Sequence, residues 1–176
     1  MFVLVRTLLY TALFVGVFFV QIPGSVLAAS GVDLSPAIGL AQAAGAAVAF
    51  GGVILVAWAT LALLLQGEGT PAPWDPPHEL VSGGPYRLLR NPMYLGGSVA
   101  LIGGALFYQL VSLLAYAAVF FFLSHCIVKG VEEPALRRRF PHRYPVYWAT
   151  VNRWRIPLPS ALTGRRRRGT TASASR

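Results

Sequence analysis

The sequence predicts an all-α integral membrane protein with about four transmembrane helices. Of its 176 residues, 55% are hydrophobic and only 12% are charged, about half the charged fraction of an ordinary soluble domain. No charged side chain occurs in three stretches, 7–32, 34–67 and 91–128. A helix needs about 20 apolar residues to cross the hydrocarbon core of a bilayer. The first two stretches therefore each fit one span, and the third fits two short spans.

The first uncharged stretch is expected to form one helix over about residues 3–20. The same region has features of a secretory signal, with Arg6 near its start, an apolar run at 8–20 and small residues at 25–29 where cleavage would occur. No soluble domain for export follows in this sequence, so we expect a retained membrane helix. Cleavage would leave the orientation of the remaining helices unchanged.

The second and third stretches complete the bundle. The second predicts a helix over about residues 37–65, and the third predicts a short hairpin of two helices. The hairpin is expected to begin after Pro92 and to turn near Gln109, the least apolar point of the stretch. These are the third and fourth helices of the predicted fold.

Small residues recur at every fourth position of the third helix, at Gly96, Ala100 and Gly104. Small side chains at this spacing let helix backbones approach closely in lipid. We therefore expect this face to pack tightly against another helix, and we assign it no chemistry.

The chain beyond the hairpin is expected to stay at the membrane surface. A short amphipathic helix is predicted from Glu132 to about Phe140, and Pro141 and Pro145 are expected to break the helix beyond it. The segment around Trp154 has the composition of an interfacial anchor.

Lysine and arginine residues lie on one side of this topology. The loop 66–90 contains Arg87 and Arg90, and twelve basic residues follow Val128. Because positive charge favours the cytoplasmic side, the N-terminus, this loop and the C-terminal tail are all predicted to be cytoplasmic. The arginines at 165–168 are expected to attract anionic lipid. They do not indicate a nucleic-acid site, since no aromatic residue interleaves them.

One domain is predicted over residues 1–162, followed by a basic disordered tail at 163–176. Polar residues gather in two blocks, 78–96 and 132–148, which adjoin the cytoplasmic ends of the hairpin and should lie close together. Cys126, the one cysteine, is expected to be a packed core thiol. No metal site is expected, because the three histidines show no ligand spacing.

The two blocks offer groups for a ligand of mixed charge. Asn91 and Pro92 suit the first positions of a helix, whose free N–H groups favour a carboxylate or a phosphate. The tyrosine faces favour a cation. Together these features predict a cytoplasmic cofactor pocket that a lipid-soluble partner could enter from the membrane.

A purely structural interpretation remains open for the same residues. Arg87 and Arg90 fit the bias of positive charge towards the cytoplasm, and the tyrosines fit anchors at the membrane interface. Glu132 and Glu133 fit a solvated pair that balances the arginines at 137–139.

The two blocks also carry a family resemblance. "HELVSGGPYRLLRNPMYLGG" and "EEPALRRRFPHRYPVYW" resemble the integral membrane methyltransferases typified by isoprenylcysteine carboxyl methyltransferase and the phospholipid methyltransferases. The resemblance spans about residues 78–157. It implies that S-adenosyl-L-methionine binds in a cytoplasmic pocket and that the acceptor is lipophilic. The cofactor-binding residues that it implies are His78, Glu79, Leu80, Val81, Tyr86, Asn91, Pro92, Met93, Tyr94 and Glu132.

This chain departs from the family pattern at three places. Asn91 stands where the family has histidine, and Pro141 stands where it has glycine. Val128 occupies the position of an arginine that binds the prenylcysteine substrate, with Lys129 beside it. The missing arginine argues against a prenylcysteine acceptor.

The leading hypothesis is therefore S-adenosylmethionine-dependent methyl transfer to a lipophilic acceptor. Lys129 and Arg90 are candidates for substrate binding, and Glu133 and Tyr147 are candidates for a base if the acceptor needs one. Two alternatives remain, a sterol-reductase-like membrane enzyme that uses NADPH and a non-catalytic membrane adaptor. The sequence indicates neither the acceptor nor the oligomeric state.

Overall fold

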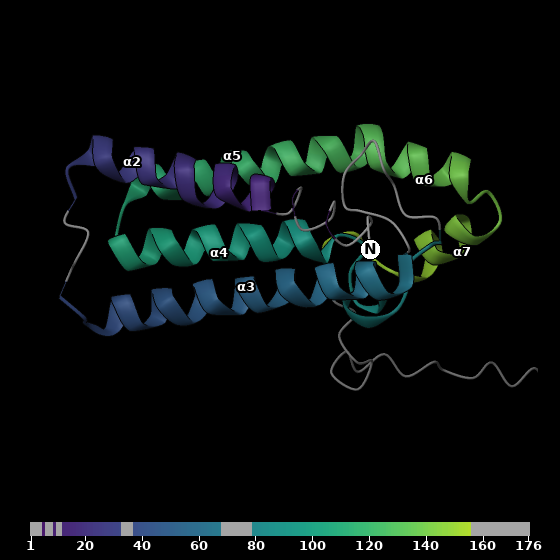
Figure 1. Cartoon of the computed structure of the whole chain (residues 1–176), viewed down its shortest axis with the longest axis horizontal. Coiled ribbons are helices and arrows are strands. Elements are labelled where there is room, and N and C mark those ends of the chain that lie inside the picture. The colour runs from purple at the N-terminus through teal and green to yellow at the C-terminus, as the bar shows by residue number, and fades with distance from the viewer. Residues whose placement is uncertain (1–4, 6–8, 10–11, 33–36, 68–78, 156–176) are drawn as a thin grey trace, which may run out of the picture.

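The described residues form an all-helical bundle, as predicted, and contain no strand (Figure 1). The structure is a computed structural model that describes residues 5, 9, 12–32, 37–67 and 79–155. Within these ranges the α-helices are α2 (Ile22–Ser30), α3 (Leu40–Gly67), α4 (Pro92–Tyr108), α5 (Val111–Ile127), α6 (Glu133–Arg139) and α7 (Arg143–Thr150). The remaining elements are two π-helical turns, η1 (Gly16–Gln21) and η3 (Val128–Glu132), and one 3-10 turn, η2 (Gly84–Arg87).

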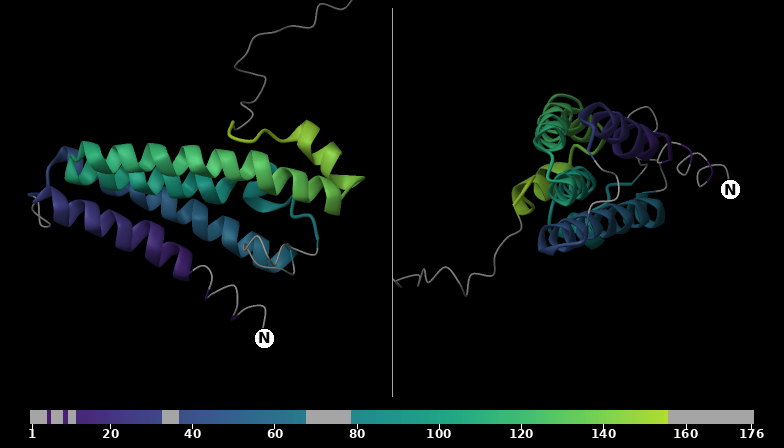
Figure 2. Two further views of the ribbon diagram at one scale, coloured as in Figure 1. Left: turned by 90° about the horizontal axis from the view of Figure 1, so that it is seen from above. Right: turned by 90° about the vertical axis from the view of Figure 1, so that its left-hand side faces the viewer.

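Three continuous helices of the described residues are long and apolar enough to cross a membrane: Ala12–Ser30, Leu40–Gly67 and Val111–Arg139. The shorter apolar α4 lies at the centre of the bundle, between α3 on one side and the α2 and α5 pair on the other (Figure 2). The all-α membrane fold predicted from the sequence is therefore confirmed.

The N-terminal helix is longer than predicted and runs on to Ser30 instead of ending near residue 20. The small residues at 25–29 are helical, and Gly31, at φ 61°, ends the helix in the left-handed conformation. Pro23 does not interrupt it. Proline lacks the N–H that the helical hydrogen-bond ladder needs, and the wider π turn η1 lies immediately before it.

The closest helix packing is between α3 and α4. A Cβ atom on Gly52 would lie 2.4 Å from the backbone nitrogen of Ala100, and one on Gly103 would lie 2.2 Å from that of Ala49. Gly96 and Ala100 therefore belong to the predicted close contact. Gly104 does not, because its added Cβ would face Leu113 of α5 at an ordinary 3.6 Å.

The hairpin turns at Gln109, as predicted, with that residue at φ 52°. Its second arm differs from the prediction, because α5, η3 and α6 form one helix from Val111 to Arg139. Pro134, the second residue of α6, does not end the helix, since the π turn η3 precedes it. In both helices, therefore, a π turn precedes the proline and the helix continues through it.

Two further expectations about this region are wrong. Pro145 does not break a helix but lies in the first turn of α7, where a missing N–H leaves no ladder bond unmade. Cys126 is exposed on the outer surface of α5 instead of packed in the core. In a helix that is apolar all round, the sequence does not reveal which face meets lipid.

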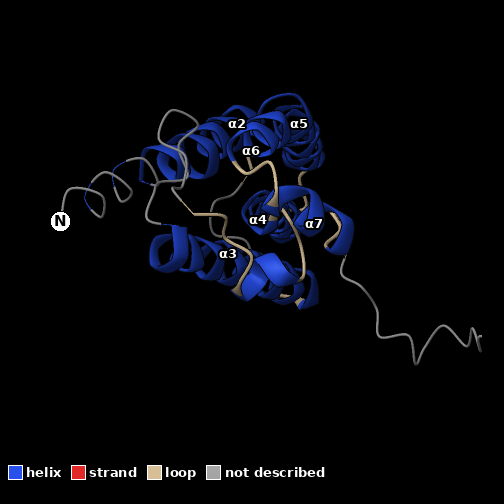
Figure 3. Ribbon diagram, turned by 90° about the vertical axis from the view of Figure 1, so that its right-hand side faces the viewer, coloured by secondary structure: helices blue, strands red, loops and turns tan. Residues whose placement is uncertain are grey.

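The two polar blocks meet at one end of the bundle, as their places beside the hairpin predicted. The loop that follows residue 78 lies there together with α6 and α7, and α7 lies beside the start of α4 (Figure 3). The end of α2, the start of α3 and the turn between α4 and α5 lie at the opposite end (Figure 1).

Candidate functional site

The two blocks are joined by a hydrogen bond between Tyr94 and Glu132. Tyr94 lies in the first turn of α4, and Glu132 is the last residue of η3. The hydroxyl group of Tyr94 donates to Oε1 of Glu132, and both side chains are partly buried. An acidic group is thus held beside an aromatic ring at the polar end of the bundle.

The neighbouring acid, Glu133, is engaged by two arginines. Nε and Nη2 of Arg153 donate to the two carboxylate oxygens of Glu133, each at 2.7 Å. Nη1 of Arg90 lies 3.1 Å from Oε1, an ion pair by distance without hydrogen-bond geometry. Glu133 is only 8% exposed, so the interpretation of the two glutamates as a solvated pair is wrong.

Trp148 binds two of the nearby cations. The guanidinium carbon of Arg90 lies 5.4 Å from the centre of the Trp148 ring, and that of Arg137 lies 5.2 Å from it. Both distances are within the range of a cation–π contact. Arg90 is therefore held by Glu133 and Trp148 together, and its side chain is 9% exposed.

The segment after α7, residues 151–154, is a C-terminal strap across this end of the bundle. The backbone N–H of Arg90 donates to the Asn152 carbonyl at 3.0 Å. Nε1 of Trp154 donates to Nδ1 of His125 at 3.0 Å. The composition of this segment predicts only an interfacial anchor and gives Arg153 no role. The chain has only six acidic residues, and an acid that is buried needs a basic partner. That requirement could have indicated that a nearby arginine pairs with Glu133.

Two further tyrosines connect the loop to α7. The hydroxyl group of Tyr147 donates to the carbonyl oxygen of Tyr86 at 2.8 Å. Burial is the main cause that raises the pKa of both phenols far above the usual value of about 10. Tyr147 therefore stays protonated and already uses its proton in this hydrogen bond.

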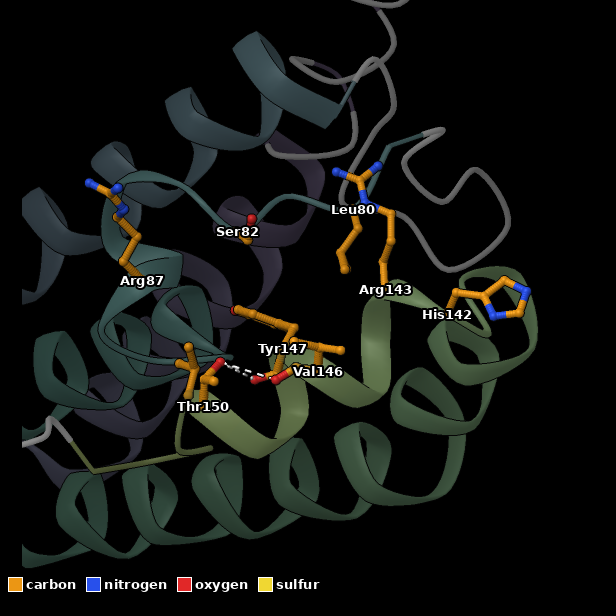
Figure 4. Close-up of a pocket in the computed structure, with 9 residues that line it drawn as sticks. Leu80, Ser82, Arg87, His142, Arg143, Val146, Tyr147 and Thr150 are labelled. Atoms are coloured by element: carbon orange, nitrogen blue, oxygen red, sulfur yellow. Dashed lines mark hydrogen bonds between the residues drawn. The ribbon is translucent and has the colours of Figure 1, made fainter.

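A cavity of about 470 Å³ opens between the loop and α7 (Figure 4). Leu80 and Tyr147, both singled out in the sequence, line it on facing sides. Glu79 is exposed nearby and accepts a hydrogen bond from Nη1 of Arg143 at 2.6 Å. Neither Tyr94 nor Glu132 lines this cavity. The residues that line it are Leu80, Ser82, Arg87, His142, Arg143, Val146, Tyr147, Thr150 and Val151.

The start of α4 leaves a donor free. Asn91 occupies the N-cap position and Pro92 the first helical position, as predicted, but the Asn91 side chain makes no cap hydrogen bond. Its Nδ2 is buried and has no hydrogen-bond partner among the described residues. Buried donors in native proteins are usually paired, so this amide is available to a ligand.

The remaining residues predicted to bind the cofactor or the acceptor differ in how deeply they are buried. Val81 is buried, Met93 is partly buried and Lys129 is exposed on η3. His78 lies outside the described residues, as does the basic tail 163–176.

A model of the family described as phospholipid methyltransferase matches residues 40–143, from the start of α3 to the start of α7. No curated protein and no solved structure matches the chain.

Proposed function

Because the chain belongs to the phospholipid methyltransferase family, we propose that it transfers a methyl group from S-adenosylmethionine to a lipid acceptor in the membrane. The family match covers more than half of the chain and includes both residues of the Tyr94–Glu132 pair. The sterol-reductase-like alternative receives no comparable support.

The observation that carries the proposal is the Tyr94–Glu132 pair. A partly buried carboxylate attracts the ammonium group of an amino acid more strongly than an exposed one does, because solvent screens it less. The adjacent tyrosine ring offers its face to a sulfonium cation. We propose that Glu132 binds the ammonium group of S-adenosylmethionine and that the Tyr94 ring lies beside its sulfonium.

A carboxylate would be accommodated at the start of α4. The free Nδ2 of Asn91 is a buried donor without a partner, and the first N–H groups of a helix favour an anion. Asn91 can therefore perform the hydrogen-bonding role of the histidine that the family has at this position.

The cavity beside Tyr147 supports a place for the adenosyl portion. Leu80 and Val146 give it apolar walls, and the Tyr147 ring gives it an aromatic one. Such walls with a few hydroxyl groups are typical of small-ligand sites. The hydrogen bond from Tyr147 to Tyr86 links this cavity to the loop that leads to Asn91.

The cofactor supplies an already activated methyl group, so the protein must mainly orient the acceptor and exclude water. Orientation alone can lower a barrier by roughly 7–11 kcal/mol. Glu133 is a poor base because two arginines hold its carboxylate, and Tyr147 is a poor one because it stays protonated. We therefore assign no base.

For contacts to the acceptor, Lys129 is the better of the two candidates. It is exposed on η3, the same turn that ends at Glu132. Arg90 is buried against Glu133 and Trp148 and has little surface left for a substrate.

We also propose the predicted orientation for this protein, with the polar end of the bundle in the cytoplasm. Residues 79–91, α6 and α7 lie together at that end, which suits a water-soluble cofactor. The basic tail would then meet the anionic lipid of the cytoplasmic leaflet.

Calorimetry of the detergent-purified protein tests the proposal. We expect S-adenosylmethionine to bind with at least micromolar-range affinity and NADPH not to bind. Membranes incubated with methyl-labelled cofactor should yield a labelled lipid. No binding of either molecule and no labelled product would favour the non-catalytic adaptor, and binding of NADPH alone would favour the reductase.

A further inference from the structure

We propose that Arg153 is a positioning residue that sets the orientation of Glu132, acting through Glu133. The inference rests on the proposed function, in which Glu132 binds the ammonium group of the cofactor. It assigns the C-terminal strap a role in cofactor affinity, although the strap lies beyond the last residue of the family match.

The first reason is the backbone that carries Glu132. This residue ends the π turn η3, and Pro134 follows two residues later. A π turn is rarer than an α turn, so we infer that surrounding contacts hold this one in place. Without such contacts the helix could rewind, and one residue of rewinding rotates a side chain by about 100°. Glu132 would then no longer face Tyr94.

The second reason is the geometry of the contact between Arg153 and Glu133, the residue after Glu132. Nε of Arg153 donates to Oε1 of Glu133 and Nη2 donates to Oε2, each at 2.7 Å. A bidentate pair of planar groups fixes direction as well as distance. Because Glu133 shares a peptide bond with Glu132, fixing one side chain fixes the rotation of the other about the helix axis.

The third reason is that the strap is itself anchored on both sides of Arg153. Asn152 accepts a hydrogen bond from the N–H of Arg90, in the loop just before α4. Trp154 donates one to His125 on α5, and its ring lies 5.0 Å from that of Phe121. Arg153 thus connects the start of α4, which carries Tyr94, to the helix that carries Glu132.

The test is a double-mutant cycle on cofactor affinity. Arg153→Gln keeps length and polarity but removes the charged fork, and we expect roughly tenfold weaker binding of S-adenosylmethionine. Arg153→Lys, which keeps the charge, should restore part of the loss. Arg155→Gln removes the same charge from an exposed position two residues on and should leave the affinity unchanged.

The decisive arm repeats Arg153→Gln in a Glu132→Gln background. If Arg153 acts through Glu132, the second substitution adds no further loss of affinity, because coupled residues are not additive. An equal loss in both backgrounds would show that the strap only supports the fold, and would overturn the inference.

Hydrogen exchange without cofactor separates this inference from the proposed function. Amides of 128–133 should exchange faster in Arg153→Gln than in Arg155→Gln. If they do while the wild type fails to bind S-adenosylmethionine, the proposed function fails and the positioning of Glu132 stands. If the wild type binds and neither exchange nor affinity changes in Arg153→Gln, the positioning role is refuted.

Discussion

The hydroxyl group of Tyr94 donates a hydrogen bond to the carboxylate of Glu132, a residue 38 positions later in the chain. The contact joins the first turn of α4 to the π turn η3. It therefore brings an aromatic ring, a carboxylate and the free N–H groups of a helix start to one place.

Glu132→Gln should weaken binding of S-adenosylmethionine roughly ten- to hundredfold, because it removes a charge-assisted contact in a partly buried site. Titration calorimetry measures the change. The same substitution at Glu68, outside both sequence blocks, is the matched control. Equal affinities for wild type and Glu132→Gln would show that Glu132 does not bind the ammonium group.

Glu133→Gln should lower the stability of the fold by about 3 kcal/mol, because it leaves the buried guanidinium group of Arg90 and the partly buried one of Arg153 without their carboxylate. Denaturant unfolding in mixed micelles measures the loss. The two adjacent glutamates therefore differ: Glu132→Gln should lower affinity alone, whereas Glu133→Gln should lower stability and, because it also breaks the contact with Arg153, the affinity as well. Unfolding curves that coincide with those of the wild type would contradict the buried ion pairs.

Gly52→Ala should destabilise the contact between α3 and α4 by about 2 kcal/mol, because the new methyl group would overlap the backbone at Ala100. Gly51→Ala is the control, since an added Cβ there meets no atom within 4 Å. Thermal unfolding in detergent compares the two. A lower melting temperature for the Gly51 variant than for the Gly52 variant would contradict the packing.

Tyr147→Phe should reduce the loss of stability at high pH. Burial raises the pKa of Tyr147 in the folded protein, whereas the unfolded chain ionises at about pH 10. The stability is therefore fully present below about pH 10 and falls as the pH rises towards the folded pKa. The variant lacks this contribution, while Tyr86 and Tyr144, whose pKa values burial also raises, retain theirs.

Stability measured across the alkaline range, for wild type and variant side by side, checks this expectation. At neutral pH the variant should be less stable by about 1 kcal/mol, because the carbonyl of Tyr86 loses its donor. A parallel alkaline decline in both proteins would show that Tyr147 titrates normally.

The helices and the end of the bundle that holds the polar residues could be predicted from the sequence. Long uncharged stretches require helices in lipid, and a hairpin brings its two flanking blocks together. Gln109 was identifiable as the turn because it interrupts an apolar run. These features depend only on the order of apolar and polar residues along the chain, and a single sequence is enough to show that order.

The details that the sequence did not predict depend on contacts in three dimensions. Proline lacks an N–H for the helical hydrogen-bond ladder, yet the helix continues through Pro134 because a π turn precedes it. No local sequence pattern marks such a turn. The pairing of Arg153 with Glu133 joins residues 20 positions apart through a segment without a motif. Cys126 lies on a helix that is apolar on every side, so hydropathy does not indicate its environment.

The central place of α4 has a consequence for biosynthesis. The N-terminal helix packs on α5, where the hydroxyl group of Tyr116 donates to the Phe18 carbonyl, and on Gly97 of α4. The extensive contact of α3 is also with α4. The ribosome makes both of these helices before the hairpin that they contact. Neither helix can therefore complete its packing until the hairpin has been made, and we expect the bundle to assemble late in synthesis.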